Sequence, residues 1–505
     1  MRRAGEDSPL HIAIVASEAV PFSKTGGLAD VAGSLPRALN AIGHRASLFA
    51  PLHRSSRQSG LQLEDTGLRL DIPVGPRIIQ GSVFLVRLPG TDVVAYLIDQ
   101  PEYFDRPQLY QTDGVDYGDN CARFVFFCRA VLETVRLLNL DVDVFHCNDW
   151  QTGLIPVYLD ELYRADLRLG RAGTLMTIHN LAYQGWFWHW DLPLTGLDWG
   201  LFNFRQLEHH GQLNFLKAGI VFADLVSTVS PTYAREIQTP AFGCGLEGLL
   251  QQRGADLRGI VNGIDTDVWN PRIDPVLAAK YDIESVAIGK AECKAQLQRR
   301  ASLTEFPDVP LFAQIGRLDS QKGWDLLLEV AEQHLQGDVQ VVILGEGSPR
   351  YHEALDRLAH RYSGKLRVFL EFSNSLAHQI EAGADLFLMP SLYEPCGLNQ
   401  LYSQAYGTVP IVHKTGGLAD TVVDATPENL ALRTATGVTF DEPTPQALMG
   451  AIERATRLFR DRGAWMSMVR AGMARDSSWN QSAREYVALY REVVEHRRVS
   501  PAEVI

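Results

Sequence analysis

The chain has 505 residues, 46% of them hydrophobic, and carries a formal net charge of −13. This length predicts two or three domains, and the acidic balance argues against nucleic acid as a partner because a protein that tracks phosphates needs a basic stripe. No apolar run reaches the roughly 20 residues that cross a bilayer, so we expect no membrane partner. The six cysteines show no Cys-x-x-Cys spacing, which argues against zinc and a disulfide framework and favours the cytoplasm.

The first predicted strand, residues 11–16, is followed by the loop Lys-Thr-Gly-Gly-Leu-Ala-Asp at residues 24–30. The same seven residues recur at 414–420, again after an apolar run, at 409–412. Paired glycines allow close approach of a ligand, and a helix that begins there directs N–H groups and a positive dipole end toward it. The lysine adds a charge that suits phosphate. A tight turn with a solvated lysine is the alternative, which the repetition of the loop disfavours.

Strands alternate with amphipathic helices along the rest of the chain. Apolar residues recur at helical spacing from Leu28 to Ile42, and Pro36 is expected to kink that helix. Further strands are predicted at 93–98, 142–146, 175–178 and 225–229, then at 311–315, 339–344, 366–369, 386–389 and 410–412, with helices such as 324–335 and 481–496. This order predicts an α/β protein with two doubly wound parallel sheets and ligands at the carboxyl ends of the strands. We expect domains at 1–262 and 263–478, and a final helical segment at 479–505.

Polar residues stand where two strands of the first half end. Asp149 follows one strand, and His179 and Asn180 follow the next. Asp149 could instead cap a helix, and an isolated histidine is more often structural, but the repeated position favours a binding rim. The segment 183–204 contains seven Trp and Phe rings. Such rings can pack on sugars, although we expect most of them to lie in the core.

Two loops of the second half carry further candidates. Arg317 and Lys322 lie between a strand and a helix, where two cations suit a phosphate. Glu394 follows another strand, shortly before the second Lys-Thr-Gly-Gly loop. A carboxylate beside a phosphate site is best explained by a neutral ligand with hydroxyls, such as a sugar.

Taken together, several motifs resemble the bacterial glycogen synthases and plant starch synthases. They are Lys-Thr-Gly-Gly-Leu-Ala-Asp at 24–30, His-Asn-Leu-Ala-Tyr-Gln-Gly at 179–185, Asn-Gly-Ile-Asp at 262–265, Gly-Arg-Leu at 316–318 with Gln-Lys-Gly at 321–323, and Glu-Pro-Cys-Gly-Leu at 394–398. The resemblance implies a GT-B fold, in which two Rossmann-like domains face each other across a cleft and the C-terminal helix crosses back to the first. It also implies retaining transfer of glucose from ADP-glucose to the non-reducing 4-hydroxyl of an α-1,4-glucan such as glycogen, without metal or cofactor.

The same resemblance implies a role for each matching residue. Catalytic roles fall to Glu394, Asp149 and His179; donor binding to Lys24, Gly26, Gly27, Asn180, Arg317, Lys322, Thr415, Gly416 and Gly417; and sugar or acceptor contacts to Tyr110 and Asp30. The backbone carbonyl of His179 would face the reacting carbon, and Glu394 would position the sugar rather than attack it. The acceptor would then approach on the side of the leaving phosphate, which takes its proton.

Two positions depart from the pattern of related families. Tyr402 stands where many retaining relatives have a second glutamate, and Glu-Phe-Ser-Asn at 371–374 replaces a more usual segment beside the base, with Phe372 as a candidate adenine contact. A UDP-glucose donor, another acceptor, and a non-enzymatic glucan-binding protein therefore stay as alternatives.

Other enzyme classes have weaker support. The nearest dinucleotide motif, at Gly345 and Gly347, lacks its third glycine. Two Asp-x-Asp sequences, at 141–143 and 265–267, have the residue pattern of the metal-binding motif in metal-dependent transferases, but nothing else in the sequence supports that class. We interpret them as a strand entry and a turn.

Overall fold

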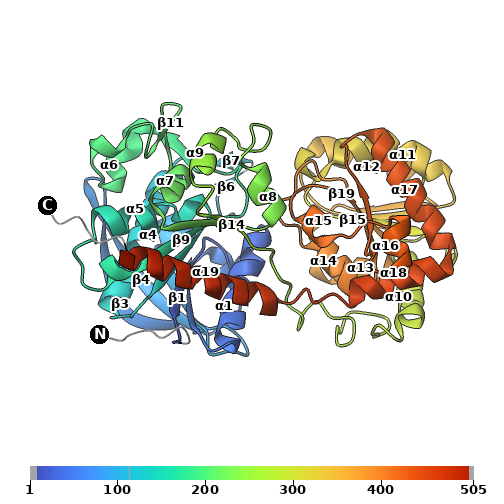
Figure 1. The fold of residues 1–505 in the computed structure, drawn as a ribbon, viewed down its shortest axis with the longest axis horizontal. Helices are drawn as coiled ribbons and strands as arrows, with labels where there is room; N and C mark the ends of the chain where they lie inside the picture. Colours follow the sequence, from blue (N-terminus) through green and yellow to red (C-terminus); the bar gives the residue numbers. More distant parts are fainter. Residues whose placement is uncertain (1–7, 113, 500–505) are drawn as a thin grey trace. The chain divides into compact units, whose positions relative to one another are not determined.

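The computed structural model describes residues 8–112 and 114–499, which form two compact units. Unit 1 contains the described residues up to Val229, then Ala234–Gly263, and then the chain from Trp479 onward. Unit 2 contains Ser230–Tyr233 and Ile264–Ser478. Figure 1 shows that the C-terminal helix α19 (Trp479–Val499) lies on unit 1. Unit 1 is thus built from segments at both ends of the sequence.

The central sheet of unit 1 has nine strands in the order β14-β13-β9-β8-β1-β2-β5-β4-β3. Their bounds are β1 His11–Val15, β2 Arg45–Pro51, β3 Glu64–Val74, β4 Arg77–Arg87, β5 Val94–Asp99, β8 Val144–Asn148, β9 Gly173–Ile178, β13 Leu225–Thr228 and β14 Leu257–Gly259. Neighbouring strands are parallel from β14 to β5, and only β4 and β3 run antiparallel. The predicted parallel sheet is confirmed, whereas the hairpin at its edge was not predicted.

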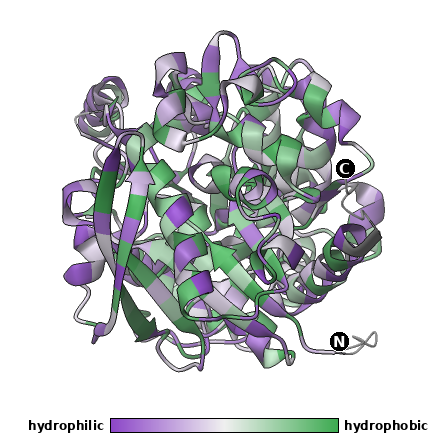
Figure 2. Cartoon of the chain, turned by 90° about the vertical axis from the view of Figure 1, so that its left-hand side faces the viewer, coloured by the Kyte–Doolittle hydropathy of each residue, from purple (hydrophilic) through white to green (hydrophobic). Residues whose placement is uncertain are grey.

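Helices cover both faces of this sheet. The longer ones are α1 Gly27–Ala41, α4 Asn120–Leu137, α5 Leu154–Glu161, α7 Phe215–Phe222 and α19. Helix α1 continues through Pro36 to Ala41. The kink expected at Pro36 stays a prediction. Helix α19 packs against α1, β8 and β9, and buries Trp479, Tyr486, Tyr490 and Val493 in the same core as the first strands. Figure 2 shows hydrophilic and hydrophobic bands alternating along the outer helices of this unit, as expected of elements with one buried face.

A small antiparallel sheet follows β9 in the sequence. It has the order β10-β12-β11, with β10 Trp186–Trp188, β11 Glu208–His209 and β12 Gln212–Asn214. The connection between β10 and β11 contains helix α6 Leu192–Thr195 and two 3₁₀ turns, η3 His189–Asp191 and η4 Trp199–Leu201. Most rings of this segment were expected to lie in the core, but the side chains of Trp188, Trp190 and Trp199 are exposed.

Unit 2 has a six-stranded parallel sheet in the order β17-β16-β15-β18-β19-β20. The strands are β15 Leu311–Ile315, β16 Gln340–Leu344, β17 Leu366–Phe369, β18 Leu386–Met389, β19 Val409–His413 and β20 Val438–Phe440. The helices include α10 Val286–Arg300, α11 Trp324–Gln336, α12 Pro349–Arg361, α13 Asn374–Gly383, α14 Asn399–Ala405, α15 Gly416–Thr421, α17 Pro445–Arg460 and α18 Arg462–Met473. Two buried apolar clusters cover the two faces of the sheet.

Both sheets have a point at which the order of strands reverses. In unit 1 the chain passes from β1 to β2 on one side and later returns to β8 on the other. In unit 2 the same reversal separates β15 from β18. Loops at the carboxyl ends of two such strands diverge and leave a crevice in which α/β proteins bind ligands. Of the candidate residues, Lys24, Asp149, Lys322 and Glu394 follow β1, β8, β15 and β18, whereas His179 follows β9 and Thr415 follows β19.

Among the described residues, no helix is both long enough and apolar enough to cross a membrane.

Candidate active site

In unit 1 the loop after β1 is held by a buried carboxylate, Glu18. The backbone N–H and the hydroxyl of Thr25 both donate to Glu18, the hydroxyl at 2.9 and 3.0 Å. Burial raises the pKa of Glu18 to about 7, against the lowering effect of the Thr25 and Gly26 hydrogen bonds. This carboxylate therefore fixes the start of the glycine pair.

Lys24 and Gly26 lie in the same loop. The Lys24 ammonium lies 2.7 Å from Asp30 Oδ1, on the first turn of α1. A Cβ on Gly26 would meet no atom within 4 Å, so the space above this backbone is open. A charged ammonium, an open backbone and a helix N-terminus together match what an anionic group requires.

Asp149 follows β8 in a backbone conformation that is rare for a residue with a side chain, with φ of 56° and ψ of −179°. Such conformations cost about 1–3 kcal/mol and are retained mainly at functional sites. The Asp149 carboxylate accepts from the His179 N–H at 2.7 Å and also from the Asn180 N–H. Burial raises its pKa to about 7, and the charge of Glu18 contributes in the same direction. The two carboxyl groups therefore lie close enough for their charges to interact.

His179 is a neutral side chain in a fixed orientation. Its Nε2 lies 2.8 Å from Asn148 Oδ1, and Asn148 Nδ2 donates to the carbonyls of Val15 and His146. Because Asn148 uses its amide hydrogens on those carbonyls, this network assigns the hydrogen of His179 to Nε2. Burial lowers the pKa of His179 to about 3. Its backbone and that of Asn180 remain tied to Asp149.

Tyr110 lies with these groups despite its distance in sequence. Its hydroxyl is 2.7 Å from Ser17 Oγ, and burial together with the charges of Glu18 and Asp149 raises its pKa. The loop that carries it is held by Arg123, which donates to the Leu109 carbonyl at 2.8 Å. The structure thus brings Lys24, Asp149, His179 and Tyr110 to one end of the unit 1 sheet.

In unit 2, Glu394 and Lys322 form an ion pair of 2.7 Å between the loops after β18 and β15. Glu394 is 5% exposed, and its Oε2 also accepts from the Ser391 hydroxyl at 3.0 Å. The pairing of these two residues was not predicted, because each was assigned separately to the sugar and to the diphosphate. One carboxylate oxygen therefore receives both hydrogen bonds, and Lys322 is held in place.

Gly323 allows those two loops to meet. It adopts a φ of 72°, and a Cβ there would lie 1.9 Å from the Pro390 carbonyl oxygen. Only glycine permits this approach without a shift of the backbone. The Leu392 N–H donates to the Gln321 carbonyl at 2.9 Å and completes the junction.

Arg317 is the more exposed cation of this loop. Its guanidinium lies 3.3 Å from Asp319 and 3.5 Å from the Gln321 amide oxygen, and half of its side chain is exposed. Its backbone carbonyl accepts from the Trp324 indole at 2.8 Å. The backbone is therefore fixed while the guanidinium stays accessible to an anion.

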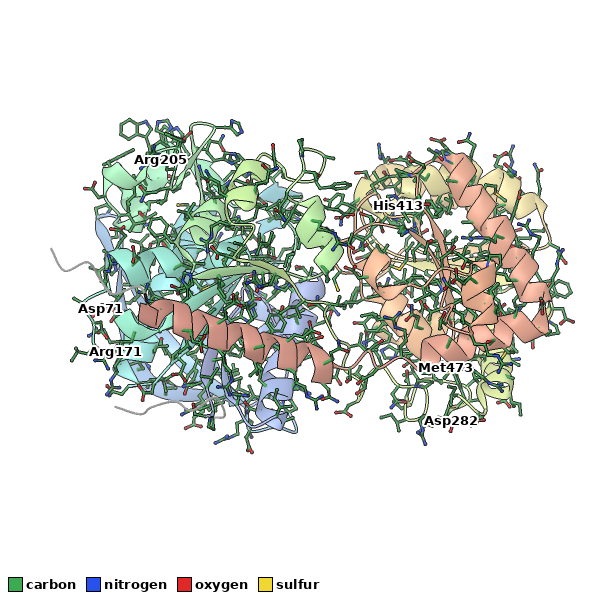
Figure 3. The ribbon with its side chains drawn as sticks, in the orientation of Figure 1. Asp71, Arg171, Arg205, Asp282, His413 and Met473 are labelled. Carbon is green, nitrogen blue, oxygen red and sulfur yellow. The ribbon has the colours of Figure 1, made fainter. Side chains whose placement is uncertain are left out.

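The second Lys-Thr-Gly-Gly loop differs from the first in its contacts. The Thr415 N–H donates to the His413 carbonyl, and the Gly417 N–H donates to the carbonyls of Glu394 and Pro395. A Cβ on Gly416 would lie 2.0 Å from the Glu394 carbonyl oxygen. This loop therefore supports the backbone of Glu394, and the predicted donation of its N–H groups to phosphate stays a prediction. The Nδ1 atom of His413, a residue labelled in Figure 3, lies 2.7 Å from the Ser391 carbonyl oxygen, at hydrogen-bond distance.

Tyr402 and Phe372, the two departures noted in the sequence, have different surroundings. Tyr402 is buried and stacks on Trp269 with ring centroids 3.7 Å apart, so this position serves packing. Phe372 is 78% exposed, and its role as an adenine contact stays a prediction.

Sequence reasoning missed Glu18, Asn148 and Ser391. Glu18 and Asn148 lie where β1 and β8 end, the same position that identified Asp149 and His179. Ser391 lies in the loop that carries Glu394. The position of each of the three residues, near a strand end or in a loop with another candidate, was visible in the sequence. A single polar residue at such a position does not reveal its hydrogen-bond partner.

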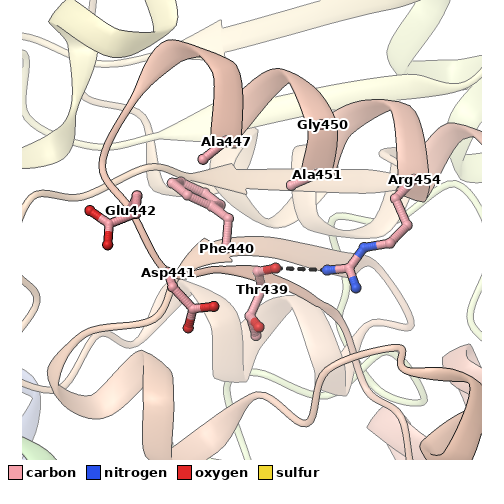
Figure 4. A pocket seen from close by; sticks show the side chains of 8 residues that line it. All are labelled: Thr439, Phe440, Asp441, Glu442, Ala447, Gly450, Ala451 and Arg454. Carbon is pink, nitrogen blue, oxygen red and sulfur yellow. Dashed lines mark hydrogen bonds between the residues drawn. The ribbon is translucent and has the colours of Figure 1, made fainter.

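No group of three or more His, Cys, Asp or Glu side chains in the described part of the chain is arranged to hold a metal ion. Asp143 accepts from the His11 N–H at 2.7 Å, which agrees with its interpretation as a strand entry. A shallow pocket beside β20 is lined by Thr439, Asp441 and Arg454 (Figure 4). Arg454 there is held by Asp424 at 2.8 Å, and the pocket contains no candidate residue.

Comparison with known proteins places this geometry in a class. Residues 11–252 match the starch synthase catalytic domain, and residues 296–463 match the glycosyl transferases group 1. The catalytic domain of starch synthase IV from Arabidopsis thaliana, solved with ADP and acarbose, superimposes with a TM-score of 0.90 at 32% identity, covering 97% of this chain and 100% of that one. Sucrose-phosphate synthase from Thermosynechococcus elongatus shares the fold, with a TM-score of 0.58 at 17% identity over 96% of this chain and 99% of that one. The chain is a glycosyltransferase of the GT-B class.

Full-length relatives narrow the class to a family. The glycogen synthase of Rhodopirellula baltica is 45% identical, with 97% of this chain and 99% of that protein covered. The glycogen synthase of Koribacter versatilis is 44% identical, with 97% of this chain and all of that protein covered. This chain belongs to the glycogen and starch synthase family.

Proposed function

We propose that the chain is a glycogen synthase that transfers glucose from ADP-glucose to the non-reducing 4-hydroxyl of an α-1,4-glucan, with retention of configuration. The observation that carries this proposal is the similarity to glycogen synthases over nearly the whole of both chains. The Arabidopsis relative was solved with ADP and acarbose, which supports a nucleotide donor and a glucan acceptor here.

Cations around the leaving group are the main source of rate acceleration in this proposal. Breaking the bond between glucose and phosphate builds positive charge on the sugar and negative charge on the departing diphosphate. Arg317 and Lys322 would bind that diphosphate, and Lys24 would bind its distal phosphate. The Lys322–Glu394 pair and the Trp324 bond to the Arg317 carbonyl support this role, because they fix the cations before the charge develops.

Glu394 would position the donor sugar rather than form a covalent intermediate. Its Oε2 already receives hydrogen bonds from Lys322 and Ser391, which withdraw electron density from the carboxylate. A carboxylate so bound is a weak nucleophile but a suitable acceptor for a sugar hydroxyl. Trapping of a glucosyl group on Glu394, detected by mass spectrometry after incubation with donor, would contradict this assignment.

Residues of unit 1 would also bind the glucose. The Asp149 carboxylate holds the His179 and Asn180 N–H groups, and the strained backbone of Asp149 fixes the direction of this hydrogen-bonded turn. We propose that the His179 carbonyl then faces the reacting carbon and stabilises its positive charge. Asp30 and Tyr110 would line the sugar or acceptor.

The cell compartment proposed is the cytoplasm. None of the six cysteines forms a disulfide bond, and five of them are buried. Cysteines without disulfide bonds are typical of proteins that fold in a reducing compartment.

Release of nucleoside diphosphate by the purified chain tests the proposal. ADP-glucose and UDP-glucose are supplied in parallel, with and without glycogen, and each reaction is repeated with a chelator. We expect ADP release that requires glycogen and survives chelation. Release from UDP-glucose alone would favour the alternative donor, and no glycogen-dependent release from either donor would favour the binding protein.

A further inference from the structure

Arg123 is a charged side chain that lies inside unit 1, near the start of helix α4. It is 0% exposed, and its guanidinium lies over the rings of Phe104, Tyr117 and Phe124, at 5.5, 5.1 and 5.3 Å from their centroids. Burial lowers the pKa of Arg123 to about 10, so the group stays charged at neutral pH. Transfer of a cation out of water is unfavourable, and a chain that keeps one inside must compensate it with hydrogen bonds.

The guanidinium of Arg123 donates hydrogen bonds to three neutral oxygen atoms. They are the carbonyl oxygens of Tyr103 and Leu109, each at 2.8 Å, and the amide oxygen of Asn120 at 2.6 Å. A guanidinium is a planar fork of five N–H donors, which suits several oxygens at fixed angles. Leu109 directly precedes Tyr110. The shape of the Arg123 side chain therefore sets the course of the backbone up to Tyr110.

Asn120 extends this contact to Tyr110 itself. Its amide oxygen accepts from Arg123, so its amide nitrogen faces the other way and donates to the Tyr110 carbonyl at 3.0 Å. The Tyr117 N–H donates to the same carbonyl, also at 3.0 Å. Because Asn120 is only 3% exposed, its orientation is set by these two partners. The Tyr110 backbone is thus held through Arg123 on two sides.

The side chain of Tyr110 meets a second fixed loop. Its ring lies 6.2 Å from the Phe124 ring, and its hydroxyl lies 2.7 Å from Ser17 Oγ in the loop after β1. The Ser17 carbonyl lies 3.0 Å from Nε2 of the buried His53, which keeps this partner in place. Glu18, the carboxylate that holds the first Lys-Thr-Gly-Gly loop, follows directly. A shift of the Tyr110 backbone would therefore move its hydroxyl away from this end of the sheet.

We propose that Arg123 is a positioning residue of the active site, which acts through Tyr110 by holding its backbone where the hydroxyl can contact the sugar. The inference rests on the proposed function for the identity of the substrate. Arg123 has no exposed surface with which to touch a ligand. A displacement of about 1 Å in a contacting group can lower a rate by about 10²-fold. The competing explanation is that Arg123 contributes only to the folding of unit 1.

A double-mutant cycle with Tyr110 tests this inference. Arg123→Lys keeps the charge but loses the fork, and we expect kcat/KM for ADP-glucose to fall about tenfold. In a Tyr110→Ala background the same substitution should change kcat/KM by less than about twofold, because the side chain through which Arg123 acts is gone. Unchanged kcat/KM of Arg123→Lys would overturn the inference. Equal losses in the two backgrounds would also overturn it, since a purely structural role does not depend on Tyr110.

Two further variants of helix α4 keep the test decisive if Arg123→Lys does not fold. Asn120→Ala removes the bond to the Tyr110 carbonyl and leaves Arg123 in place. It should lower kcat/KM about threefold in the parent and leave it unchanged in the Tyr110→Ala background. The same loss in both backgrounds, or no loss in either, would contradict the inference. Arg136→Lys, at a partly exposed position paired with Glu133, is the matched control and should resemble the parent.

Hydrogen exchange separates this inference from the proposed function, because it requires no substrate. In Arg123→Lys the amides of residues 105–112 and 115–119 should exchange faster than in the parent, while those of strand β8 should exchange at the parent rate. Parent-like exchange of both segments would overturn the inference even in a chain that is an active transferase. Faster exchange in a chain that releases no ADP would confirm that Arg123 holds Tyr110 and would reject the proposed function instead.

Discussion

Two identical heptapeptides in this chain have different partners. Lys24 pairs with Asp30 inside its own loop at 2.7 Å, whereas Lys414 is 54% exposed and lies 3.8 Å from Asp441. The first loop is held by the Glu18 carboxylate, and the second holds the backbone of Glu394. The same sequence therefore has a lysine paired within its own loop in one place and gives structural support to a neighbouring loop in the other.

Replacement of the two lysines should reveal this difference. We expect Lys24→Ala to lower kcat/KM for ADP-glucose about 10²-fold, because one preorganised cation on the leaving group is lost. Lys414→Ala is the matched control and should stay within about twofold of the parent. Steady-state ADP release measures both, and equal losses would contradict the distinction.

The raised pKa of Asp149 makes part of the stability of unit 1 depend on pH. An aspartate ionises near pH 3.9 when unfolded, but burial raises the pKa of Asp149 to about 7 in the folded chain. Between these values the folded state holds a proton that the unfolded state has lost. The contribution of Asp149 to stability is therefore complete below about pH 4 and declines as the pH rises to about 7.

Asp149→Asn should remove this dependence. Relative to the parent, the variant should gain stability by up to a few kcal/mol on going from pH 5 to pH 8, measured by denaturant unfolding. Asp65→Asn is the control, since Arg69 lowers the pKa of the exposed Asp65 to about 2, outside that range. A stability difference between Asp149→Asn and the parent that does not change with pH would show that Asp149 is ionised in the folded chain throughout.

Strand-end positions were enough to select Asp149, His179, Arg317, Lys322 and Glu394 as candidates from the sequence. What the sequence could not show was which of these residues meet. Lys322 and Glu394 are 72 positions apart, and their ion pair depends on two loops approaching at Gly323. Partners set by the packing of distant loops leave no local pattern.

At the scale of elements, the buried parallel strands were predictable because they are short, apolar and followed by helices. The hairpin of β3 and β4 was not, because its strands alternate exposed and buried positions at the edge of the sheet and include charged residues. The tryptophans between β10 and β11 were misjudged for the opposite reason. Aromatic residues usually lie inside, and only the fold shows that these remain outside.

Gly323 lies where the loops after β15 and β18 meet, and a side chain there would disturb their contact. Gly323→Ala would place a methyl group 1.9 Å from the Pro390 carbonyl oxygen at a φ of 72°. We expect a loss of about 1–3 kcal/mol of stability, and a lower kcat/KM because Lys322 and Glu394 move apart. Thermal unfolding and ADP release measure the two effects.

Gly450→Ala provides the contrast. This glycine lies within helix α17, and a Cβ there would meet no atom within 4 Å. The substitution should raise stability by about 0.5–1 kcal/mol. If both variants unfold at the parent temperature, the close approach at Gly323 is not required.

At the scale of the whole molecule, unit 1 depends on the last helix of the chain. Helix α19 buries Trp479, Tyr486, Tyr490 and Val493, and the Tyr490 hydroxyl lies 2.8 Å from His146 Nδ1 beneath β8. Full burial of each such side chain contributes about 1.5–3 kcal/mol. The sum is comparable to the entire stability of a typical domain.

A chain that ends at Ser478 should therefore lose the cooperative unfolding of unit 1 and keep that of unit 2, whose core lies within residues 264–478. Differential scanning calorimetry of the truncated and full chains measures this. Glu485→Ala, on the exposed side of α19, is the control and should unfold like the parent. Two intact transitions in the truncated chain would contradict the dependence.

Helix α19 also sets an order on biosynthesis. A ribosome completes all of unit 2 before it makes the helix that unit 1 requires, so the N-terminal half must wait with part of its apolar core uncovered. Exposed cores of nascent chains are what chaperones bind. A chain that lacks helix α19 would thus expose the part of the unit 1 core that this helix covers.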